Sequence, residues 1–89
     1  MSTYLVTFEI NDFERKIKLK EQMKLFNGYC PIHDNAWAII TEKKSAEIRE
    51  MLSINLITTD RIFIIRSGTE AAWLNAYGLT NSEWLKKHL

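Results

Sequence analysis

The chain has 89 residues, of which 46% are hydrophobic and 26% are charged, and its formal net charge is +1. This length allows a single domain, and the composition is typical of a folded globular protein and excludes a disordered chain. The small net charge gives no general attraction to a polyanion, although a local basic patch could still provide one.

The single cysteine, Cys30, excludes an internal disulfide and a cysteine-rich zinc site. A lone thiol suits a reducing compartment, so we expect a cytoplasmic protein. The sequence lacks an apolar run of about 18 residues, so we expect no membrane span. We also expect no signal peptide, because the first residues lack a basic region and a small-residue cleavage site.

Residues 3–10 alternate with the period of a β-strand. One face is wholly apolar and should lie under helices; it consists of Tyr4, Val6, Phe8 and Ile10. Next, Asn11 and Glu14 form a capping pair that predicts a helix from about residue 12 to residue 27, before Gly28. Its apolar stripe consists of Leu19, Met23 and Phe26. Residues 15–20 also alternate and could form a strand instead.

Residues 29–33 and 36–41 flank the turn sequence Asp34-Asn35 and predict a hairpin. Pro31 cannot donate to a neighbouring strand, so the first arm should lie at an edge of the sheet. The second arm is apolar on both sides and should lie inside the sheet.

Ser45 should cap a second helix over about residues 46–56, whose buried face consists of Ile48, Met51, Leu52 and Leu56. Residues 61–66 follow, and their four apolar positions, 62–65, are typical of a central strand that is covered on both faces. Residues 69–79 carry no clear pattern. Thr80 and Glu83 then form a capping box for a last helix.

This order of elements predicts an α+β protein with a ferredoxin-like βαββαβ fold, in which two helices cover one face of a four-stranded antiparallel sheet. We treat residues 1–89 as a single domain. Its core spans residues 3–66, and residues 67–89 form a C-terminal tail that ends in a short helix.

The other face of this sheet needs cover, because apolar side chains left in water lose ~25 cal/mol per Å2 of stabilisation. The tail with Trp73 and Trp84, a second copy of the chain, or both could supply it. We expect a homodimer that forms through the sheet, with the tail contributing. The expected interface consists of Leu5, Phe63, Ile65 and Trp73.

Five stretches together span nearly the whole chain: STYLVTF at 2–8, NAWAIIT at 35–41, SAEIR at 45–49, DRIFIIRSGTEAAW at 60–73 and SEWL at 82–85. In order and spacing they resemble a group of small bacterial proteins labelled SinR-like, which are thought to share the fold of the small CRISPR adaptation nuclease and of VapD-type toxins. The resemblance implies a ferredoxin-like homodimer built through the sheet.

In the nuclease relatives, an acid ends the first strand close to the dimer axis, where paired carboxylates can hold a divalent metal. The resemblance places Glu9 at this position, as a candidate ligand for Mg2+ or Mn2+ and, with Asp12, as a candidate catalytic residue. Glu9 stands where the relatives carry Asp, and the longer side chain shifts the carboxylate, which disfavours a two-fold metal site. The alternative is a solvated strand end followed by an acid at a helix start.

Residues 15–24 hold five basic residues and one acidic residue, Glu21. The basic residues are candidates for binding RNA or DNA phosphates and consist of Arg15, Lys16, Lys18, Lys20 and Lys24. The alternative is an ordinary exposed helix face whose lysine stems cover an apolar stripe.

The other polar and aromatic candidates have simpler interpretations. His33 beside Asp34 could form an acid–base pair, but we interpret it as a polar residue before a turn. We interpret Cys30 as a small buried residue rather than a nucleophile. Trp37 should belong to the core, whereas Trp73 should anchor the tail or a partner interface.

We therefore expect a small dimeric interaction module that binds nucleic acid or a protein partner without catalysis and without a cofactor, in a defence, toxin or mobile-element system. One alternative is a metal-dependent endoribonuclease that uses Glu9 and Asp12. Another is a phage- or plasmid-encoded inhibitor that docks on a host protein through an exposed edge strand.

Overall fold

The computed structural model describes residues 1–68, 70–73 and 78–89, so residues 69 and 74–77 of the predicted tail lie outside the described residues. The elements in chain order are β1 (Ser2–Glu9), α1 (Phe13–Met23), β2 (Gly28–His33), β3 (Ala36–Thr41), α2 (Ser45–Leu52), the short 3-10 helix η1 (Ser53–Asn55), β4 (Arg61–Arg66) and α3 (Gly78–His88). The strands form one antiparallel sheet in the order β2-β3-β1-β4. The expected α+β class and the four expected strands are confirmed.

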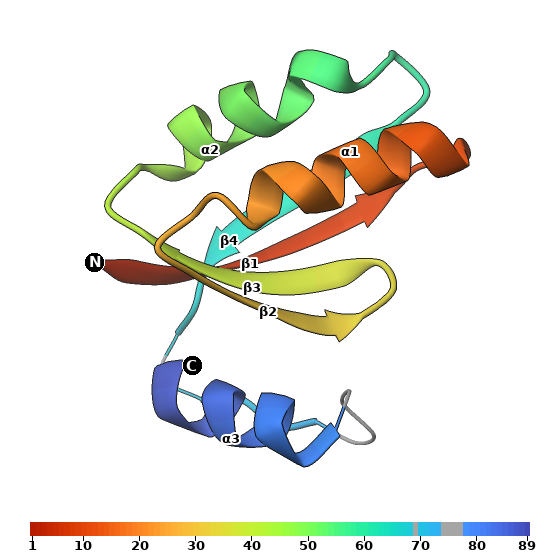
Figure 1. The fold of residues 1–89 in the computed structure, drawn as a ribbon. Helices are drawn as coiled ribbons and strands as arrows, with labels where there is room; N and C mark the ends of the chain where they lie inside the picture. Colours follow the sequence, from red (N-terminus) through yellow and green to blue (C-terminus); the bar gives the residue numbers. More distant parts are fainter. Residues whose placement is uncertain (69, 74–77) are drawn as a thin grey trace.

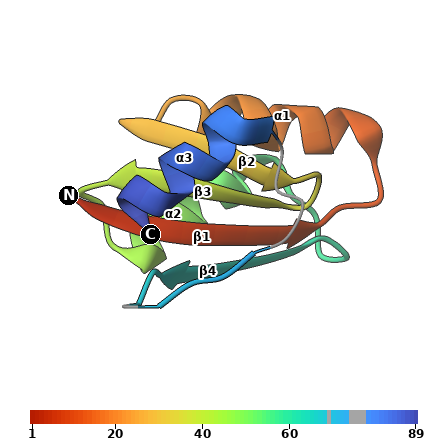
Figure 2. The same cartoon turned by 90° about the horizontal axis from the view of Figure 1, so that it is seen from below.

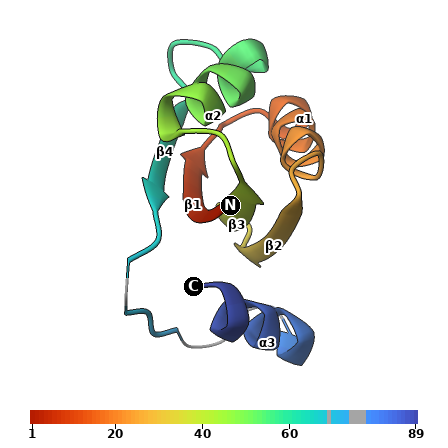
Figure 3. The same cartoon turned by 90° about the vertical axis from the view of Figure 1, so that its left-hand side faces the viewer.

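The sheet lies between two layers of helix. Figure 1 shows α1 and α2 on one side of the sheet and α3 on the other, and Figure 3 shows the same layers from the end of the strands. We call the face under α1 and α2 the first face, and the face toward α3 the second face. None of the described helices is long and apolar enough to cross a lipid bilayer.

The first face carries the main core, because apolar side chains alternate along β1 and meet two amphipathic helices. The apolar face predicted for residues 3–10 is buried, and so is the apolar stripe predicted for the helix that follows it. The remaining buried members of this cluster come from β3 and α2 and consist of Trp37, Ile39, Ile48 and Leu52. Burial of Trp37 in the core is as predicted, while Met51 and Leu56 of the predicted α2 face are only partly buried.

The second face has a smaller core over β2 and β3. Leu85 of α3 packs against Cys30 and Ala38, and the indole of Trp73 is among the partly buried groups around them. Figure 2 looks onto this face and shows α3 crossing β2 and β3, while β4 lies at the opposite edge of the sheet. The tail therefore covers the β2–β3 half of the second face. This agrees with the expectation that the tail contributes to the cover of this face.

The helix ends differ from the predicted ones by a few residues. Asp12 rather than Asn11 caps α1, and its Oδ2 accepts a hydrogen bond from the backbone N of Arg15 at 2.9 Å. An ionised carboxylate also complements the helix dipole, which favours Asp over Asn at this position. The N-cap of α2 is Lys44, whose backbone N donates to Glu47 Oε1 at 3.0 Å, so Ser45 is the first helical residue.

The other ends are shorter or earlier than predicted. Helix α1 ends at Met23 and continues as turns, in which the backbone N of Leu25 donates to the carbonyl oxygen of Gln22 at 3.1 Å. Helix α2 ends at Leu52 and tightens into η1, and α3 begins at Gly78, before the predicted cap.

Strand β4 is an edge strand, so the prediction that it is central and covered on both faces was wrong. Its apolar residues do point to both faces. Ile62 and Ile64 pack against the first-face core, whereas Phe63 and Ile65 point to the second face and stay exposed. Apolar residues on both faces usually indicate a buried strand, and here they indicate instead a strand with uncovered apolar surface.

Candidate interaction surface

The acid at the end of β1 is bound by a basic residue of β4. Glu9 lies directly opposite Arg61 in the β1–β4 register, and the Arg61 guanidinium donates a hydrogen bond to Glu9 Oε1. Both side chains are exposed. The carboxylate that the sequence offers as a metal ligand therefore already has a cation beside it, which weakens its attraction for another.

Asp12, the second candidate acid, is occupied as the cap of α1. A surface depression of about 970 Å3 brings Glu9 together with Lys16 and His33, but Asp12 is absent from its lining. Within the described ranges, no group of three or more His, Cys, Asp or Glu side chains could hold a metal ion. Asp12 therefore does not share the depression that Glu9 lines.

We call Arg15, Lys16, Lys18, Lys20 and Lys24 the basic row. Two lysines of this row bind a carboxylate in the β2–β3 turn. Lys16 Nζ donates to Asp34 Oδ2, and Lys20 Nζ donates to Asp34 Oδ1 at 2.7 Å. These hydrogen bonds, the one from Lys16 foremost, lower the pKa of Asp34 to about 2. The two lysines therefore fix the hairpin turn to the side of α1.

The other two lysines of the row are more exposed. Lys24 Nζ lies 3.4 Å from Glu21 Oε1, whereas Lys18 makes no ion pair with any residue that the structure describes. Charges that are already paired with carboxylates release fewer counterions when a phosphate approaches. The row on α1 thus offers less net positive charge than its sequence suggests.

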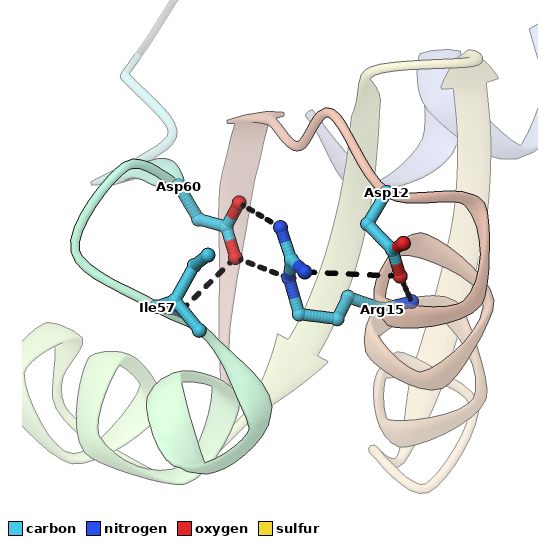
Figure 4. Close-up of polar contacts among 4 residues, drawn as sticks. All are labelled: Asp12, Arg15, Ile57 and Asp60. Atoms are coloured by element: carbon cyan, nitrogen blue, oxygen red, sulfur yellow. Dashed lines mark hydrogen bonds and ion pairs between the residues drawn. The ribbon is translucent and has the colours of Figure 1, made fainter.

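Figure 4 shows the fifth basic residue, Arg15, in a two-pronged contact with Asp60, which directly precedes β4. Arg15 Nε and Nη2 donate to Asp60 Oδ2 and Oδ1 at 2.9 and 3.0 Å, and the backbone N of Ile57 also donates to Asp60 Oδ2 at 3.0 Å. The Asp60 side chain has no exposed surface. Arg15 thus joins α1 to the connection between η1 and β4.

These contacts shift the pKa of both partners. The hydrogen bond from Arg15, followed by the one from the Ile57 backbone, lowers the pKa of Asp60. The same contact with Asp60 raises the pKa of Arg15. A bidentate pair of this kind fixes the orientation of both side chains, so Arg15 has a structural role.

Sequence reasoning missed the two acids that bind the basic row. Asp34 lies 18 residues from Lys16, and Asp60 lies 45 residues from Arg15. The turn sequence around Asp34 predicted its hairpin but not the neighbouring helix, and no local pattern marks Asp60. These ion pairs could be identified only from the fold, which places each acid beside helix α1.

His33 and Cys30 have structural surroundings. His33 Nδ1 accepts a hydrogen bond from the backbone N of Asn35 at 3.1 Å, within the predicted turn. Cys30 is buried as predicted, and its Sγ lies 3.8 Å from the carbonyl oxygen of Asn81 in α3. Burial raises the pKa of the Cys30 thiol, which keeps it protonated and unreactive at neutral pH.

Three of the four predicted interface residues form a continuous apolar strip on β1 and β4. Phe63 and Ile65 are 61% and 49% exposed, and Leu5 is partly buried directly opposite Ile65. All three lie on the second face, on the half opposite the α3 contact with β2. We call Leu5, Phe63 and Ile65 the β4 strip.

The fourth residue, Trp73, belongs to the tail. Trp73 Nε1 donates a hydrogen bond to Ser82 Oγ at 3.3 Å, and its ring is partly buried against the second-face core. Leu5 and Ile65 of the strip and Trp73 of the tail together line a pocket of about 390 Å3. Trp73 therefore anchors the tail within one chain.

On the first face, a small groove runs along β4 beside α2. Its volume is about 150 Å3, and it is lined by Ser45, Ala46, Arg49, Ile62 and Ile64. Strand β4 thus has accessible apolar surface on both faces. Within the part of the chain that the structure describes, β4 pairs with β1 alone, so its outer edge is also open.

The described residues therefore present an extended apolar surface at the β4 edge, besides other exposed apolar side chains such as Phe13 and Leu25, while the candidate acids and most of the basic row are bound within the chain. Comparisons of the chain with protein-family models, with curated proteins and with solved structures found no match.

Proposed function

We propose that this chain is a small ferredoxin-like interaction module without catalysis of its own, and that it forms a homodimer through the β4 side of its sheet. The ferredoxin-like assignment is supported by the strand order, with β1 and β3 central and β2 and β4 at the edges, and by the position of α1 and α2 on one face. The unpaired, buried thiol of Cys30 favours the cytoplasm.

The observation that carries this proposal is the exposure of the β4 strip. Phe63 and Ile65 are large apolar side chains on one strand, and they adjoin Leu5 on the next. Contiguous exposed apolar surface at the edge of a sheet is typical of a protein–protein contact. Burying it removes apolar area from water, at about 25 cal/mol per Å2.

Electrostatics favours a protein partner over nucleic acid. Four of the five basic residues within residues 15–24 are bound to carboxylates, which leaves Lys18 as the member without such a contact among the described residues. The binding of Glu9 by Arg61 and the capping role of Asp12 likewise support a module without metal-dependent catalysis.

Size-exclusion chromatography with light scattering tests self-association over a concentration series. We expect the mass of the parent chain to rise from 10.5 kDa toward twice that value. Phe63→Glu should remain monomeric, because it places a charge in the apolar contact. Ile54→Glu is the matched control: Ile54 is 74% exposed, lies in η1 outside the strip, and should leave self-association unchanged.

A parent chain that stays monomeric at every concentration would contradict the proposal. Cleavage of RNA with Mg2+ or Mn2+ that is lost in Glu9→Gln would replace it with the nuclease alternative. Salt-sensitive binding of RNA or DNA that is lost on reversing the charge of Lys16, Lys20 and Lys24 would favour a nucleic-acid partner.

A further inference from the structure

The two edges of the sheet are protected very differently. On the β2 edge, Pro31 cannot donate a hydrogen bond to an added strand, and the register shifts between Pro31 and His33. On the β4 edge, residues 62–65 are four consecutive apolar residues without a proline, a charge or a register shift. An edge strand of this kind is a template for pairing with another strand.

We propose that this strand is β4 of a second copy, and that the two β4 strands pair antiparallel to join both sheets into one continuous sheet. This inference rests on the proposed self-association and specifies its geometry. It differs from a dimer in which the second faces of two sheets stack on each other.

Two-fold symmetry restricts the register of such a pair. Residues directly opposite each other in an antiparallel pair lie on the same face of the sheet. A two-fold axis perpendicular to the sheet keeps the first faces of both copies on one side, so the residue at the axis lies opposite its own copy. With Ile64 at the axis, Phe63 lies opposite Ile65 of the second copy, on the second face.

This register covers the two exposed apolar residues of β4 with each other. It also leaves Arg61 and its contact with Glu9 beyond the paired segment, opposite Ser67 of the second copy, and it places Arg66 at the end of that segment, opposite Ile62 of the second copy. An axis at Phe63 would instead place Arg61 opposite Ile65 and bury an ion-paired charge in the contact. Arg66 is exposed and lies at the end of the paired segment, whereas an axis at Phe63 would bring the ion pair of Arg61 and Glu9 into the contact, so the ion pair favours Ile64 at the axis.

The first face also accommodates the second copy. The groove beside α2 has small side chains, Ser45 and Ala46, on one side and the apolar Ile62 and Ile64 on the other. The strand that fits this edge needs apolar residues toward both faces, to meet the groove and the β4 strip together. That is the pattern of β4 itself, which is why we assign the place to a second copy rather than to an unrelated peptide.

The contact is small. Five residues of β4, 62–66, pair from each copy, compared with about 20–30 residues on each side of a standard interface. The dimer should therefore be reversible and its population should depend on concentration.

Disulfide trapping tests the register directly, because directly opposite residues have Cα atoms within the range of about 4.4–6.8 Å that a disulfide spans. All variants carry Cys30→Ala, which removes the only native thiol. Under mild oxidation, Ile64→Cys should form a covalent dimer in high yield. Ile54→Cys, on an exposed site outside β4, is the matched control and should not.

Because Ile64 is partly buried and its variant could fail to fold, a second pair uses exposed sites. A tagged Phe63→Cys chain mixed with an untagged Ile65→Cys chain should give mostly the mixed dimer, since these positions lie opposite each other. Dimers of Phe63→Cys alone in excess over the mixed dimer would overturn the register. The absence of any β4 cross-link in chains that light scattering finds dimeric would overturn edge pairing while leaving self-association in place.

Discussion

At the residue scale, two acids hold α1 against the rest of the chain. Asp60 binds Arg15 from the segment before β4, and Asp34 binds Lys16 and Lys20 from the hairpin turn. Neither acid could be assigned this role from the sequence, because a polar contact between distant segments leaves no periodic pattern. The N-cap of α1 was predicted to within one residue, because the cap and the helix it starts are neighbours in the chain.

These acids make stability depend on pH in a defined direction. Both have pKa values below the unfolded value of about 3.9, so the unfolded chain binds more protons and stability is lost as the pH falls. Their contribution is fully present above about pH 4, and Asp34 loses its share as the pH approaches about 2. Thermal unfolding of the parent chain followed from pH 7 to pH 2 should show this acid decline.

Asp60→Asn isolates one of the two acids. At pH 7 the variant should melt at a lower temperature than the parent, because it removes the carboxylate that accepts two hydrogen bonds from the Arg15 guanidinium and leaves the longer contact with Asp12 Oδ2 at 3.8 Å. The difference should shrink at acid pH, where the parent also loses the charge of Asp60. Glu21→Gln, which alters the exposed pair with Lys24, is the control and should change the melting temperature little. Equal pH profiles for Asp60→Asn and the parent would refute this role.

At the element scale, α3 covers a smaller core than α1 and α2 do. It packs mainly on β2 through Leu85, which is fully buried in a small cluster separate from the first-face core. Small clusters beneath a terminal helix typically open without unfolding the rest of the domain. We therefore expect α3 to be the first described element to separate from the sheet.

Leu85→Ala tests this expectation by hydrogen exchange. Truncation of a buried leucine costs about 2–5 kcal/mol. Exchange should quicken in α3 and change little in β1 and β3, because the first-face core does not include Leu85. Lys86→Ala changes the exposed neighbouring residue and should leave exchange in α3 close to that of the parent. Equally faster exchange in every strand would instead mean that α3 and the sheet unfold together.

Most elements could be predicted from sequence because their patterns are local. Alternation in residues 3–10 and helical spacing in α1 each specify one buried face, and Pro31 correctly placed β2 at an edge. The four apolar residues of β4 did not reveal its position in the sheet. A buried central strand and an edge strand with exposed apolar side chains carry the same pattern. Strand order depends on pairing between distant segments, which this pattern does not encode.

At the scale of the whole molecule, one chain covers its sheet unequally. The first face is closed by two helices and the β2–β3 half of the second face by α3, but the described residues leave the β4 strip and the β4 edge uncovered. The described residues of one chain thus meet the expected need for cover on the second face only in part. The proposed second copy supplies cover at the remaining edge.

Hydrogen exchange of the β4 backbone amides, measured over a series of protein concentrations, tests this account most directly. If β4 pairs with its copy, the outward-facing amides of residues 61–66 become hydrogen-bonded, and their exchange should slow as the concentration rises while exchange in the β3 amides stays constant. Exchange in β4 that is fast and independent of concentration, up to the highest concentration at which the chain remains in solution, would contradict the proposed pairing.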